Sequence, residues 1–127
     1  MRYVRDDIHR MAGYVPGEQP QEDGWVKLNT NENPYPPSPA VREAIGAELD
    51  RLAAYPDPVS RALCTAAAET CGLQPDQVIA GNGSDDILNI LIRAAAAESE
   101  IVASFSPSYT LYGTLAAIQG ASHHVIP

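Results

Sequence analysis

The spacing of apolar residues along this chain predicts helices and strands in an ordered succession. Apolar residues three or four positions apart are typical of amphipathic helices, which we expect over 1–12, 39–54, 59–71, from Ser84 to at least 95, and over 109–118. Short runs rich in Val and Ile are typical of strands, which we expect over 25–28, 78–80, 101–103 and 124–126. From residue 78 onward, strands and helices alternate, so the pattern predicts an α/β fold with a parallel sheet.

Residues that begin and end helices support these boundaries. Ser38 is a favourable N-cap and is followed by Pro39, which suits the first helical position. Gly72 and Gly120 follow apolar helical segments, and glycine commonly ends a helix in the left-handed conformation.

Composition and charge narrow the range of partners. The 127 residues carry eight Lys and Arg against sixteen Asp and Glu, for a formal net charge of -8. Nucleic-acid binding requires a basic face, so we expect no nucleic-acid partner. No apolar run approaches the roughly 18–20 residues that span a bilayer, and the charged N-terminus does not resemble a secretory signal. We therefore expect a cytoplasmic location and no membrane partner.

The histidines do not predict a metal site. His123 and His124 are adjacent, so in a strand their side chains point to opposite faces and cannot share an ion. The chain has no Cys-x-x-Cys or His-x-x-x-His spacing. We expect no bound metal.

The segment Gly81-Asn82-Gly83-Ser84-Asp85-Asp86 is the strongest local signal. It joins an expected strand to an expected helix, and the unpaired N–H groups of a helix N-terminus favour an anion. The alternative is a plain turn, with Ser84 as N-cap and the acids complementing the helix dipole. The segment lacks the third glycine of a dinucleotide fingerprint and the Gly-Lys-Ser/Thr of a P-loop.

Tyrosines mark the same edge of the expected sheet. Tyr109 and Tyr112 follow the strand at 101–103, and ligands of open α/β sheets bind where the strands end. A tyrosine ring there could cover a flat heterocycle, or it could be an ordinary amphipathic core residue. Tyr55, before Pro56, has the corresponding alternatives of ligand contact and packing anchor.

Four sequence blocks together resemble the histidinol-phosphate aminotransferase family. These are pyridoxal-phosphate enzymes of the aspartate-aminotransferase fold type, and the blocks keep the order and approximate spacing of that family: Lys27 to Tyr35, Tyr55 to Pro58, Gly81 to Asp85, and Pro107 to Tyr109 with Tyr112. The resemblance implies an N-terminal fragment of a three-layer α/β/α domain with an N-terminal arm. It implies an arm and small-domain segment over 1–54, and the first part of the large cofactor-binding domain over 55–127.

The resemblance also implies roles for individual residues. Gly83, Ser84 and Asp85 match the segment that holds the phosphate of pyridoxal 5'-phosphate, and Tyr109 matches the aromatic residue against its pyridine ring. Tyr55 matches a tyrosine that reaches the cofactor phosphate of the neighbouring subunit, which implies a homodimer. The matches to segments near the substrate pocket are Tyr14, Asn31 and Asn33.

The implied reaction is amino-group transfer between L-histidinol phosphate and 2-oxoglutarate in histidine biosynthesis. The cofactor of such an enzyme is bonded to a lysine as a Schiff base, but the only lysine here, Lys27, matches a non-catalytic position. We therefore expect no catalytic residue in this chain and no activity from it alone. Asp86 stands where the family commonly has glutamate.

Two other interpretations stay open at this point. A related pyridoxal-phosphate enzyme, such as threonine-phosphate decarboxylase, would have the same kind of glycine turn at its phosphate site. A non-catalytic phosphate-binding or interaction module would share the turn without the chemistry.

Overall fold

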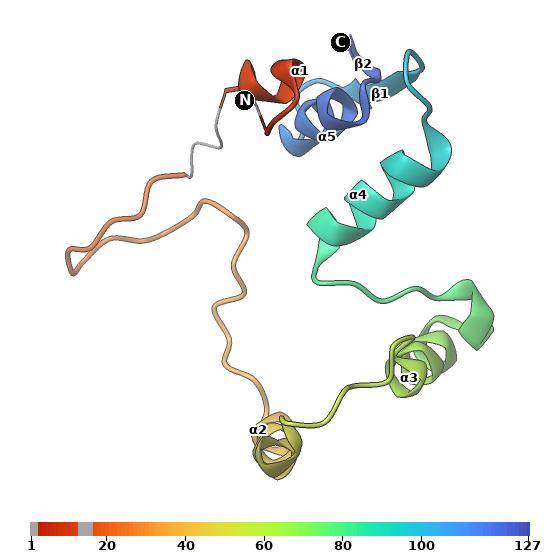
Figure 1. The fold of residues 1–127 in the computed structure, drawn as a ribbon. Helices are drawn as coiled ribbons and strands as arrows, with labels where there is room; N and C mark the ends of the chain where they lie inside the picture. Colours follow the sequence, from red (N-terminus) through yellow and green to blue (C-terminus); the bar gives the residue numbers. More distant parts are fainter. Residues whose placement is uncertain (1–2, 13–16) are drawn as a thin grey trace. The chain divides into compact units, whose positions relative to one another are not determined.

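The computed structural model describes residues 3–12 and 17–127. Their contacts form two compact units, one made of the residues up to Arg10 together with Pro56–Pro127, and the other of Met11–Tyr55. The second unit contains helix α2 (Pro39–Glu48) and the short 3-10 helix η1 (Leu49–Arg51). The first contains α1 (Asp6–His9), α3 (Arg61–Cys71), the 3-10 helix η2 (Pro75–Gln77), α4 (Ser84–Ala95), β1 (Ile101–Phe105), α5 (Leu111–Gln119) and β2 (Ser122–Ile126) (Figure 1).

A parallel pair of strands with a helical crossover forms the end of the chain. β1 and β2 pair in parallel, with Ile101 opposite Ser122 and Phe105 opposite Ile126. Helix α5 connects the strands and contacts both of them (Figure 1). The strand–helix–strand order from 101 onward and the parallel pairing are therefore confirmed.

The core lies where α4, α5 and the strands meet. Its buried residues are Ile92, Ala96, Leu115, Ala116 and Ala121, and Leu88, Val102 and Leu111 pack against them. Leu88 and Ile92 come from the apolar face of α4, and Leu111, Leu115 and Ala116 come from that of α5. Burial of these faces holds α4 against the crossover unit.

Helix α5 covers the face of the sheet that carries Val102 and His123. A Cβ on Gly113 of α5 would come within 2.8 Å of His123 Nδ1, so the absence of a side chain lets the helix approach the strand. The same imidazole hydrogen-bonds across the strands to Ser104, with 2.9 Å between Nε2 and Oγ. On the opposite face Ile101 and Phe105 are exposed.

Glycines and proline end and begin the helices as expected. Gly72 after α3 and Gly120 after α5 both have left-handed backbone angles, with φ of 69° and 80°. Helix α2 begins at Pro39, directly after Ser38.

Several expected elements are shorter or absent. Residues 25–28 and 78–80 are not strands, because within the described residues neither run pairs with a neighbouring strand. Of the helix expected over 1–12, the described residues form only the four-residue α1, which buries none of its residues, and a short helix without packing is marginal in water. The helix expected over 39–54 ends at Glu48 and continues only as η1.

Candidate functional site

The backbone at Gly83 directs the chain into α4. Gly83 is the N-cap residue and has φ of 82° and ψ of 178°, a conformation that essentially only glycine adopts. A side chain there would meet no atom within 4 Å, so the requirement for glycine comes from the backbone and not from crowding. The turn before α4 therefore depends on glycine at position 83.

Asp86, in the first turn of α4, stabilises the turn before the helix by a hydrogen bond. Its Oδ2 accepts a hydrogen bond from the backbone N–H of Asn82 at 3.0 Å. A Cβ on Gly81 would lie 2.8 Å from the same oxygen, so Gly81 leaves the space that the carboxylate occupies. From the sequence, Asp86 was expected only to complement the helix dipole, and its bond to the turn was not expected. The signal that could have found it is the four-residue spacing from Asn82, because Asp readily hydrogen-bonds nearby backbone groups.

The N-terminus of α4 has no side-chain cap. The N-cap residue is Gly83, which has no side chain to cap the helix, so Ser84 is the first helical residue and not the N-cap that the plain-turn interpretation expected. Within the described residues, the N–H groups of Ser84, Asp85 and Asp86 have no acceptor. Unpaired first-turn N–H groups and the helix dipole together favour an anion at this position.

Tyr109 lies beside this helix end and contacts both Asp85 and Tyr112. Its hydroxyl donates to the Asp85 carboxylate, with 3.2 Å to each oxygen. Its ring also makes an edge-to-face contact with Tyr112, with centroids 6.2 Å apart and planes at 83°. The ring remains about half exposed, at 48%. The structure thus brings together Gly83, Ser84, Asp85 and Tyr109 from the set that the sequence singled out.

The remaining candidates belong to the Met11–Tyr55 unit. Tyr55, Asn31 and Asn33 are exposed. Asn33 Oδ1 accepts a hydrogen bond from the backbone N–H of Tyr35 at 3.0 Å, and Asn31 has a left-handed φ of 52°. Tyr14 lies outside the described residues.

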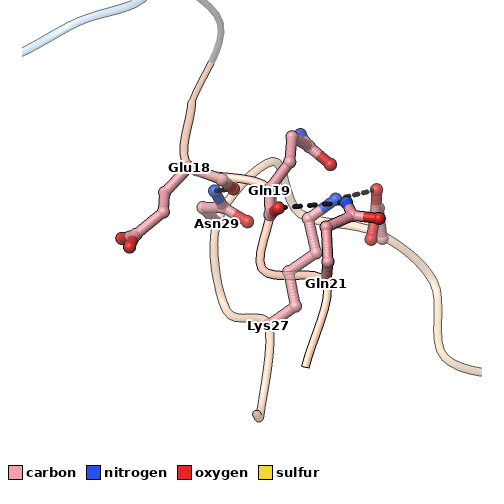
Figure 2. Close-up of polar contacts among 6 residues, drawn as sticks. Glu18, Gln19, Gln21, Lys27 and Asn29 are labelled. Atoms are coloured by element: carbon pink, nitrogen blue, oxygen red, sulfur yellow. Dashed lines mark hydrogen bonds and ion pairs between the residues drawn. The ribbon is translucent and has the colours of Figure 1, made fainter. Parts of the chain in front are cut away.

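The only lysine of the chain is engaged in the same unit. Lys27 Nζ lies 2.5 Å from Glu32 Oε1, and this hydrogen bond lowers the pKa of Glu32 (Figure 2). Nearby, the side-chain amide of Asn29 donates to the Glu18 carbonyl at 3.0 Å, and that of Gln21 donates to the Gln19 carbonyl at 3.1 Å (Figure 2). These bonds organise a polar segment in which Lys27 already has an anionic partner.

The described part of the chain offers neither a cluster of metal ligands nor a membrane-spanning helix. Residues 3–12 and 17–127 contain no group of three or more His, Cys, Asp or Glu side chains that could hold a metal ion. None of their helices has the length and apolar character that crossing a bilayer requires.

Similar proteins give this geometry a context. The chain is 58% identical over 123 residues to a histidinol-phosphate aminotransferase of Syntrophotalea carbinolica, covering 95% of this chain and 35% of that protein. It is 48% identical over 124 residues to one of Rippkaea orientalis, covering 98% of this chain and 36% of that protein. The chain therefore spans about a third of the length of the curated relatives it matches.

A solved structure and a family model agree with these relatives. The crystal structure of histidinol-phosphate aminotransferase from Sinorhizobium meliloti in complex with pyridoxal-5'-phosphate matches with a TM-score of 0.72 and 26% identity, over 77% of this chain and 27% of that one. The resemblance and the fold type expected from the sequence are confirmed. The model of the family described as aminotransferase class I and II matches residues 23–127. The chain belongs to the aminotransferase class I and II family.

Proposed function

We propose that this chain is part of a histidinol-phosphate aminotransferase, which transfers an amino group between L-histidinol phosphate and 2-oxoglutarate in histidine biosynthesis. The observation that carries the proposal is identity of 48–58% to histidinol-phosphate aminotransferases of several bacteria, over more than nine tenths of this chain. No observation on the chain favours a decarboxylase or a non-catalytic module over this activity.

The residues at the start of α4 fit the phosphate of pyridoxal 5'-phosphate. In this proposal the open N–H groups of Ser84 and Asp85 donate to the phosphate, and Gly83 allows the backbone to approach it. The Tyr109 ring lies against the pyridine ring, a place supported by the contact of Tyr109 with Asp85. When bound, the cofactor would supply an electron sink for the reaction, and these residues would bind and orient it.

The remaining assignments extend the proposal to the whole enzyme. Tyr55 contacts the cofactor phosphate of the neighbouring subunit in a cytoplasmic homodimer, and its full exposure in this chain leaves it available for such a contact. Asn31, Asn33 and Tyr14 line the substrate pocket. Residues 1–54 form the N-terminal arm and small-domain segment, and 55–127 begin the large domain.

The test is an assay of the product of the complete reading frame that contains these residues. We expect glutamate to form from 2-oxoglutarate in the presence of L-histidinol phosphate and pyridoxal phosphate. Threonine phosphate serves as the competing substrate, with release of carbon dioxide as the readout of a decarboxylase. Carbon dioxide release without glutamate formation overturns the proposal.

A further inference from the structure

We propose that the Asp85 carboxylate is a positioning residue, which acts through the Tyr109 hydroxyl to hold the Tyr109 ring at the N-terminus of α4. The inference rests on the proposed function, because the ring is the surface offered to the cofactor. It assigns to the Asp85 side chain a task distinct from that of the Asp85 backbone N–H, which faces the phosphate in that proposal.

The hydrogen-bonding pattern separates these two tasks. An acid in the first turn of a helix ordinarily complements the dipole or caps the free N–H groups. Asp85 makes no capping bond; both of its carboxylate oxygens instead lie 3.2 Å from the Tyr109 hydroxyl. A carboxylate also repels a phosphate, so the side chain gains nothing as a direct phosphate ligand. Its geometry suits the orientation of Tyr109.

The contact ties together two elements that are distant in sequence. Asp85 and Tyr109 are 24 residues apart, one in α4 and the other in the segment between β1 and α5. Tyr112 contacts the Tyr109 ring by an edge, while Asp85 holds its hydroxyl end. A ring that is 48% exposed can change rotamer when one hold is lost. Loss of the Asp85 contact should therefore change the orientation of the ring while the helix end stays intact.

The first experiment tests the contact without any ligand. Nuclear Overhauser effects between the Tyr109 ring protons and the first turn of α4 are measured in the 127-residue chain and its variants. We expect them in the wild type and in Asp85→Asn, whose amide oxygen still accepts from the hydroxyl, and we expect their loss in Asp85→Ala and Tyr109→Phe. Tyr112→Phe is the matched control, because its hydroxyl makes no hydrogen bond in the described part of the chain.

The second experiment measures what the positioned ring contributes. Affinities for pyridoxine 5'-phosphate, which has no aldehyde to react with Lys27, and for inorganic phosphate are obtained from the amide shifts of residues 84–86. We expect Asp85→Ala and Tyr109→Phe each to weaken binding of pyridoxine 5'-phosphate relative to inorganic phosphate. The ratio of the first affinity to the second should fall by about threefold to tenfold, the range of one hydrogen bond. The double variant should lose no more than either single variant.

The outcomes distinguish this inference from the proposed function. If neither ligand shifts the amides of α4, the phosphate site of the proposed function fails, and the Overhauser contacts alone decide the positioning role. If both ligands bind and the ratio is unchanged in Asp85→Ala, the positioning role is wrong. Absence of the Overhauser contacts in the wild type, or their loss in Asp85→Asn as well as in Asp85→Ala, also overturns it.

Discussion

Asp86 accepts a hydrogen bond from the backbone N–H of Asn82, at 3.0 Å, so a residue in the first turn of α4 holds the turn that opens the same helix. This bond pairs the Asp86 carboxylate with the turn, and the N-cap residue of the helix, Gly83, has no side chain that could cap the first-turn N–H groups. The bond therefore holds the turn, while the glycine at the N-cap leaves the helix end open.

Removal of the Asp86 carboxylate should loosen this turn. We expect Asp86→Ala to lower the free energy of unfolding by roughly 1 kcal/mol, the net contribution of one hydrogen bond. Asp86→Asn keeps an acceptor and should lose less. Urea unfolding followed by circular dichroism measures both, and equal losses in the two variants would contradict the role of the acceptor.

Gly83 should not tolerate a side chain even though space is available. We expect Gly83→Ala to cost about 1–3 kcal/mol of stability, because φ of 82° with ψ of 178° is strained for any other residue. Gly46→Ala in α2 is the matched control, since a Cβ there also meets nothing within 4 Å but the backbone is helical. The control should gain roughly 0.5–1 kcal/mol.

The close approach of α5 to β2 should depend on Gly113 and His123 together. A Cβ on Gly113 would lie 2.8 Å from His123 Nδ1 and push the ring from its hydrogen bond with Ser104. We expect Gly113→Ala to destabilise the chain in the wild type and to stabilise it by roughly 0.5–1 kcal/mol in a His123→Ala background, where only the helix propensity remains. Additive effects in this double-mutant cycle would refute the coupling.

The stability of α3 should fall in acid through Asp57. The backbone N–H of Arg61 and then that of Val59 donate to its carboxylate at 3.0 and 3.2 Å, and these bonds hold the pKa of Asp57 below its ordinary value of 3.8. The folded chain therefore favours the charged form. This stabilisation is complete above the ordinary pKa and is lost as the pH falls through the lowered one.

Replacement of Asp57 should make the stability of the chain less dependent on pH in the acid range. We expect Asp57→Asn to weaken the dependence of the melting temperature on pH below about 4, the ordinary range of aspartate. Asp23→Asn is the control, because the described residues show no such backbone hydrogen bonds to Asp23. A wild-type melting temperature that does not change between neutral and acid pH would show that the hydrogen bonds contribute nothing.

The 127-residue polypeptide by itself should not transaminate. Its only lysine is Lys27, which is paired with Glu32 and which the family resemblance leads us to expect at a non-catalytic position. The check is incubation with pyridoxal phosphate, reduction with borohydride, peptide mapping and a parallel assay of glutamate formation, with Lys27→Arg as control. A stoichiometric adduct at Lys27 together with measurable turnover would contradict this expectation.

The boundaries of several elements could be predicted because local chemistry determines them. Gly72 and Gly120 end helices in the left-handed region, where a side chain is disfavoured, and Pro39 begins α2 without losing a hydrogen bond. The glycine turn before Ser84 and the family resemblance were also readable from the sequence, since both depend on residue types at short spacings.

The strands expected at 25–28 and 78–80 show the limit of such reasoning. A run of Val, Ile and Leu has the propensity for a strand, but a strand exists only where its backbone groups pair with a neighbour. The described residues provide that pairing for β1 and β2 alone. Pattern by itself could not distinguish these cases.

The sequence by itself determined that Gly72 and Gly120 end helices, that Pro39 begins one, and to which family the chain belongs. Only the tertiary structure decided that Asp85 meets Tyr109 and that His123 lies against Gly113. The physical reason is that local preferences act over a few residues, whereas side-chain partners across 10 or 24 positions depend on how packed elements approach.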